Sequence, residues 1–196
     1  MEFIEQPYQV TTKGHSRTDD TGIPYEVGDY TRTKELQEQL KVFIYLALFS
    51  GLRKGELLAR ADIDFEKGVV TVSKSVGYTK GEQFVKVPKT RHGFRKVAIP
   101  HFLTLRIKAM KTERLRYRLS VGDYWQGGEW LFVQENGKLM SYSTPYQAFH
   151  DSVLRYNENH REALPVIPLH GLRHTSATLL IASNQDIRSV SARLGH

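Results

Sequence analysis

The sequence predicts an α+β fold that is mostly α-helical, with a small three-stranded antiparallel sheet inserted between helices. Two patterns lead to this class. Apolar residues recur at steps of three and four over residues 33–50 and again after Pro100, as in helices with one buried face. Between these stretches, residues 69–99 are rich in β-branched side chains that alternate in part and are interrupted by glycine and proline.

The first residues, 1–32, are polar, and Thr, Gly, Asp and Pro are scattered among them without a period. They are expected to be a linker or an irregular leader. A helix is expected from Thr33, whose hydroxyl suits an N-cap, with Glu35 in its first turn. Gly51 is a typical helix stop, and a second short helix is expected over residues 53–60.

The remaining elements follow from the same patterns. Strands are expected over residues 69–76, 83–87 and 95–99. A short extended piece at 130–133 precedes a turn at Asn136-Gly137. Helices are expected over residues 102–119, 144–159, 169–183 and 186–194. With 196 residues, the chain can form one domain with a hydrophobic core.

The chain is basic, with a formal net charge of +7 and a pI near 9.5. This excess favours a polyanionic partner, because neutralising phosphates releases counterions; solubility alone is the alternative. The absence of cysteine excludes disulfides, thiolate metal sites and cysteine nucleophiles. No apolar run approaches a membrane span and no secretion signal is recognised, so an intracellular protein is expected.

Arg53 begins the predicted short helix directly after the Ser50-Gly51 stop. Backbone N–H groups and a guanidinium at a helix start can bind an anion together. Glu56 lies one turn further on, where it can pair with Arg53 and orient it. Taken alone, both residues are equally typical of a solvated helix terminus.

Lys89 lies in Val-Pro-Lys-Thr between two predicted strands, so its amine is expected at a hairpin tip. Such an amine can donate a proton when nearby cations lower its pKa. A solvated turn lysine is the alternative, and Lys86 and Lys96 are nearby rivals for the role. Arg91 and Arg95 flank the same hairpin and are expected to bind DNA through phosphate contacts.

His170 and Arg173 are three residues apart at the start of a predicted helix, so both point from one face. Imidazole can move a proton near neutral pH, and guanidinium can hold two phosphate oxygens. His170 and His174 could together bind a metal, but no glutamate lies between them and Arg173 would repel a cation. No metal is therefore expected, and His174 is predicted to be a buried, hydrogen-bonded structural residue.

The order of these motifs is far more specific than any one of them. Gly51-Leu-Arg-Lys-Gly-Glu56, Pro88-Lys-Thr90, His170-Gly-Leu-Arg-His-Thr175 and the final Leu194-Gly-His196 closely resemble the catalytic domain of tyrosine recombinases, the phage integrases. The similarity covers residues 33–196. It implies that Glu56 and His174 support the site, and that the catalytic groups are Arg53, Lys89, His170, Arg173 and His196.

The resemblance implies a site-specific DNA recombinase, an integrase of a phage or mobile element, which cuts and rejoins strands through a 3′-phosphotyrosine intermediate without metal or cofactor. The implied partner is double-stranded DNA, bound by a homotetramer of the full-length protein in the bacterial cytoplasm, associated with the nucleoid. The family places its nucleophilic tyrosine beyond the third-box histidine, here His196, whereas the last tyrosine of this sequence is Tyr156. This chain is therefore expected to bind DNA without cleaving it.

Three alternatives stay open. A type IB topoisomerase shares the fold and the chemistry but only relaxes supercoils. A non-catalytic protein on the same fold would use the arginines merely to hold the DNA backbone. A metal-dependent nuclease would use His170, His174 and His196 as ligands.

Overall fold

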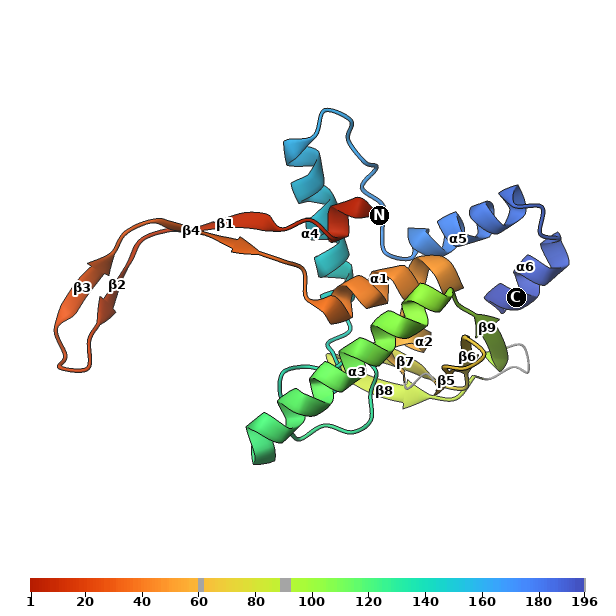
Figure 1. The fold of residues 1–196 in the computed structure, drawn as a ribbon, viewed down its shortest axis with the longest axis horizontal. Coiled ribbons are helices and arrows are strands. Elements are labelled where there is room, and N and C mark those ends of the chain that lie inside the picture. The colour runs from red at the N-terminus through yellow and green to blue at the C-terminus, as the bar shows by residue number, and fades with distance from the viewer. Residues whose placement is uncertain (60–61, 89–92, 196) are drawn as a thin grey trace.

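The computed structural model describes residues 1–59, 62–88 and 93–195 (Figure 1). Its helices are α1 (Glu38–Ser50), α2 (Lys54–Leu58), α3 (His101–Val121), α4 (Thr144–Asn159), α5 (Gly171–Ala182) and α6 (Ile187–Leu194), with the 3-10 turns η1 (Glu2–Ile4) and η3 (Gly122–Tyr124). Helices and small antiparallel sheets together confirm the predicted α+β class. Each helix predicted after Pro100 is found within two residues of its expected bounds.

The sequence predicted that residues 1–32 are a linker or an irregular leader. In the structure, most of them form an antiparallel ribbon instead. Strand β1 (Tyr8–Thr12) pairs with β4 (Tyr30–Lys34), and β2 (His15–Thr18) pairs with β3 (Pro24–Val27). The ribbon extends away from the helical body (Figure 1). It lacked a sequence signal because nearly all its side chains are polar or exposed, so no apolar face alternates with a polar one.

Helix α1 is the centre of the core. It begins at Glu38 rather than at the predicted Thr33, because residues 30–34 belong to β4. Contacts with α2, α3, α4 and α5 surround it, and the side chains of Val42, Phe43 and Ile44 are fully buried. This burial explains its almost continuous apolar run, which differs from the single stripe of a surface helix.

The predicted single sheet is divided into two. Strands β5 (Asp62–Asp64), β6 (Val69–Val72) and β9 (Arg95–Ala98) form a three-stranded antiparallel sheet. Strand β7 (Ser75–Thr79) instead pairs with β8 (Glu82–Lys86), and α2 packs against β7. The predicted strand over 69–76 is therefore two strands, and β8 and β9 lie in different sheets rather than in one hairpin.

Candidate active site

Arg53 is placed by the tight turn between α1 and α2. Gly51 adopts a left-handed conformation with φ of 65°, which ends α1 and redirects the chain. Arg53 then caps α2, and its backbone N–H donates to a carboxylate oxygen of Glu56 at 2.8 Å. The guanidinium of Arg53 donates to the other oxygen of Glu56 at 3.2 Å. The side chain of Arg53 is still 42% exposed, so its guanidinium can reach an external anion.

Glu56 is buried and accepts hydrogen bonds from two arginines. Besides Arg53, it is bound by Arg95, whose Nη1 and Nη2 donate to the two carboxylate oxygens at 3.0 and 2.8 Å. Burial raises the pKa of the Glu56 carboxyl, but the hydrogen bonds from Arg95 and Arg53 lower it more, so the net pKa lies below the ordinary value. The carboxylate is therefore ionised and can orient Arg53.

Arg95 does not lie where the sequence placed it. The sequence predicted a phosphate contact, whereas the side chain is only 7% exposed and is paired with Glu56. Its Nε also donates to the carbonyl of Arg193 at 2.8 Å. Arg95 lies on the side of β9 that faces inward. The charge pattern of the neighbouring residues does not show which side of the strand that is.

Arg173 joins three segments of the site. It is buried on α5, and it donates to the carbonyl of Gly51 at 2.7 Å and to that of Leu194 at 2.6 Å. Burial, together with the neighbouring Arg53, lowers its pKa to about 10, so the group stays charged at neutral pH. Arg173 thus sits directly behind the turn that carries Arg53.

His170 caps α5, one turn before Arg173. Partial burial lowers its pKa, and positive charge on His174, Arg173 and Arg53 lowers it further, which favours a neutral imidazole. The rings of His170 and His174 lie edge to face, 5.3 Å apart. His174 is exposed, contrary to the predicted burial, because the inner face of α5 is formed by Leu172, Arg173 and Ser176.

A groove of about 550 Å³ opens beside Arg53 and His170. Lys54 lies over the ring of Tyr142 at 3.7 Å, and Tyr78 stacks on the same ring at 5.7 Å. Lys86, one of the predicted rivals of Lys89, also lines this groove. The sequence did not indicate the groove, because its walls come from α2, the β7–β8 hairpin, α4 and the residues before α5.

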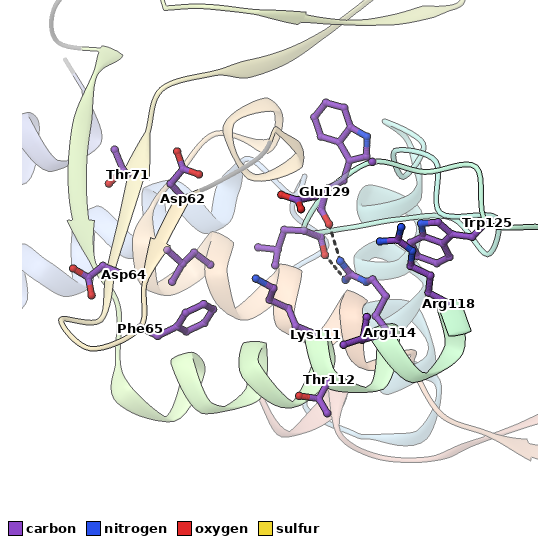
Figure 2. A pocket seen from close by; sticks show the side chains of 15 residues that line it. Asp62, Asp64, Phe65, Thr71, Lys111, Thr112, Arg114, Arg118, Trp125 and Glu129 are labelled. Atoms are coloured by element: carbon purple, nitrogen blue, oxygen red, sulfur yellow. Dashed lines mark hydrogen bonds between the residues drawn. The ribbon is translucent and has the colours of Figure 1, made fainter. Parts of the chain in front are cut away.

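A larger cavity of about 700 Å³ lies away from these residues, between β5 and α3 (Figure 2). Arg114 projects from α3 and donates to the carbonyls of Trp130, at 2.7 Å, and of Leu131. None of the predicted site residues lines it.

Within the described ranges, no three His, Cys, Asp or Glu side chains gather as metal ligands would. In the same ranges, no helix is long and apolar enough to cross a membrane.

Three predicted site residues, Lys89, Arg91 and His196, lie outside the described residues. The structure brings together the other predicted catalytic residues, Arg53, His170 and Arg173, with Glu56 between Arg53 and the buried Arg95.

Comparisons with known proteins agree on one family. The model of the phage integrase family matches residues 26–196. A XerC-like tyrosine recombinase of Caldanaerobacter subterraneus subsp. tengcongensis is 28% identical over 172 residues, covering 81% of this chain and 42% of the relative. The ICEBs1 integrase of Bacillus subtilis is 29% identical over 172 residues, covering 82% and 43%.

A solved structure of the Tn1549 transposon integrase, in complex with transposon right-end DNA, matches with a TM-score of 0.70 and 26% identity. It covers 83% of this chain and 52% of the integrase chain. This chain thus spans less than half the length of the two curated relatives described above. The matched residues, the shared fold and the ordered motifs establish that the chain belongs to the phage integrase family of tyrosine recombinases.

Proposed function

We propose that residues 33–196 are the catalytic domain of a site-specific DNA recombinase, an integrase of a phage or mobile element. The observation that carries the proposal is that Arg173 binds the carbonyl of Gly51, two residues before the exposed Arg53. This bond holds Arg173 close to the turn that carries Arg53, and both arginines lie near enough to His170 to lower its pKa. The similarity to integrases, one of them solved with DNA, supports double-stranded DNA as the ligand.

In the proposed reaction, a tyrosine oxygen forms a bond to the scissile phosphorus while the bond from phosphorus to the 5′ oxygen breaks. Arg53 and Arg173 stabilise the negative charge on the non-bridging oxygens. His170 takes up the phenolic proton, and Lys89 gives a proton to the leaving 5′ oxygen. The phosphotyrosine bond conserves the energy of the phosphodiester, so the reverse attack by a 5′-hydroxyl rejoins a strand.

The proposal extends to the assembly and its place in the cell. His196 and His174 complete the site, Arg91 contacts the DNA backbone, and four copies of the full protein act together on DNA in the cytoplasm, at the nucleoid. The relatives found here are recombinases, integrases and transposases, which favours recombination over the relaxation of supercoils.

A nicked suicide substrate tests the proposal. The full gene-encoded protein is expected to form a covalent adduct with it, measured on a denaturing gel. The 196-residue chain is expected to bind the same DNA, measured by fluorescence anisotropy, but to form no adduct, because no tyrosine follows His170. A full protein that binds DNA without any adduct would favour the non-catalytic alternative, and an adduct with the 196-residue chain would contradict the assigned nucleophile.

A further inference from the structure

The guanidinium of Arg95 lies where α2, β9 and the end of α6 meet. Its Nη1 and Nη2 donate to the two oxygens of Glu56 at 3.0 and 2.8 Å, and its Nε donates to the carbonyl of Arg193 at 2.8 Å. These partners are 39 and 98 residues away in sequence. One buried side chain therefore connects the helix that carries Arg53 to the last turn of α6.

The end of α6 is closely fitted to this guanidinium. Gly195 is left-handed with φ of 76°, and a Cβ built on it would lie 2.9 Å from Nη1 of Arg95. Arg173 donates to the next carbonyl, that of Leu194, at 2.6 Å. Two buried arginines thus bind the consecutive carbonyls of Arg193 and Leu194, at the negative end of the α6 dipole.

Glu56 links Arg95 to Arg53 through hydrogen bonds. Its carboxylate accepts from both side chains and from the backbone N–H of Arg53, at distances between 2.8 and 3.2 Å. A displacement of Arg95 would therefore move both Glu56 and the exposed guanidinium. Such displacements matter, because a misplacement of about 1 Å can cost on the order of a hundredfold in rate.

We infer that Arg95 is a positioning residue of this site, which holds Glu56 and Arg53 in fixed relation to the end of α6 without contacting DNA. The side chain of Arg95 is only 7% exposed. Its three guanidinium nitrogens all donate to acceptors inside the protein. The effect on catalysis rests on the proposed function, whereas the effect on α6 does not.

The positive charge of Arg95 also lowers the pKa of the Glu56 carboxyl, an effect that an uncharged side chain of the same shape would not have. Without it, Glu56 stays buried and loses two donors, so the pKa of the Glu56 carboxyl rises relative to wild type. A protonated Glu56 orients Arg53 less well. Removal of Arg95 should therefore change how activity depends on pH.

The first test measures hydrogen exchange in the 196-residue chain and needs no DNA. The amide of Gly195 donates to the carbonyls of Ser191 and Ala192 at 2.9 and 3.1 Å. In Arg95→Gln we expect this amide to exchange about tenfold faster or more, as the last turn of α6 opens. Lys96→Gln removes the same charge from the next, exposed residue and should leave the exchange unchanged.

Amides of α1 report whether the fold is intact, and Arg95→Lys serves if Arg95→Gln does not fold. Lysine keeps the charge but cannot bind both oxygens of Glu56 and the carbonyl of Arg193, so a smaller acceleration at Gly195 is expected. Unchanged exchange at Gly195 in a folded Arg95 variant would overturn the inference.

The second test measures single-turnover cleavage of the suicide substrate by the full gene-encoded protein. Arg95→Gln should lower the rate at saturating DNA by about tenfold or more, with the Kd for DNA changed by less than about threefold. The acid limb of its pH–rate profile should move to higher pH. A weakened Kd with an unchanged saturated rate would instead identify a DNA contact and refute the positioning role.

The two tests separate the two proposals. If the wild-type full protein forms no adduct, the proposed function fails, and the exchange at Gly195 still decides whether Arg95 holds the end of α6. If wild type forms the adduct and neither measurement responds to Arg95→Gln, the inference about Arg95 fails alone.

Discussion

Arg173 is buried and binds the carbonyls of Gly51 and Leu194, and in the proposed reaction its guanidinium also stabilises the charge on the phosphate. Arg173→Lys keeps the positive charge but loses the two-pronged geometry. We expect cleavage by the full protein to be abolished while most of the DNA affinity remains. Because buried carbonyls lose their donor, we also expect the free energy of unfolding to fall by about 1–3 kcal/mol.

Suicide-substrate cleavage, anisotropy and urea denaturation measure these three quantities for Arg173→Lys. Arg188→Lys is a matched control, because Arg188 is exposed on α6. Equal cleavage by wild type and Arg173→Lys would refute the assigned role.

His170 offers a second prediction for a single residue, because positive charge on His174 is one cause of its lowered pKa. His174→Gln should raise the pKa of His170, measured by NMR titration of the ring protons. His101→Gln, at the exposed start of α3, should leave it unchanged. A pKa of His170 that stays constant or falls in His174→Gln would contradict the coupling.

The same shift predicts how stability depends on pH. His170 binds a proton more weakly in the folded protein than in the unfolded chain, so protonation favours unfolding. We expect this contribution to reduce the free energy of unfolding as the pH falls below about 6.5, and to do so less in His174→Gln. Urea denaturation between pH 7 and about pH 5 measures both slopes.

At the scale of elements, the stop between α1 and α2 depends on Gly51. Its φ of 65° disfavours any side chain, and a Cβ there would lie 2.5 Å from Cδ2 of the buried Leu194. Gly22 has a similar φ of 84° with no atom within 4 Å of the added Cβ, so Gly22→Ala measures the backbone strain alone. We expect Gly51→Ala to lose about 1–3 kcal/mol more than Gly22→Ala in urea denaturation. Equal losses would show that Leu194 moves away without cost.

At the scale of the whole molecule, the N-terminal ribbon stands apart from the body (Figure 1). Its outer part, residues 13–29, carries two basic and four acidic side chains, so it does not add to the positive charge of the chain. Replacing residues 13–29 by Asn-Gly keeps the pairing of β1 with β4 through a two-residue turn. We expect the free energy of unfolding to change by less than about 1 kcal/mol, and the DNA affinity not to fall.

Denaturation and anisotropy at a fixed salt concentration measure this ribbon variant. A clear loss of DNA affinity would show that the ribbon contacts DNA despite its charge.

The sequence by itself determined the features that are local or ordered along the chain. The periodicity of apolar residues predicted α3 to α6, and the order of the motifs around Arg53, Lys89 and Arg173 identified the family. Each of these signals is contained within a few neighbouring residues or in the order of short motifs, so no knowledge of long-range contacts is needed.

Only the tertiary structure decided which strands pair and which charges meet. The division of the sheet, the ordered ribbon and the exposure of His174 depend on what each segment packs against. Arg95 reads as a phosphate contact in the sequence, but its guanidinium turns inward to Glu56, 39 residues away, because a buried carboxylate requires donors. Arg173 likewise meets Gly51 across 122 residues, and such pairings leave no periodic or local trace in the chain.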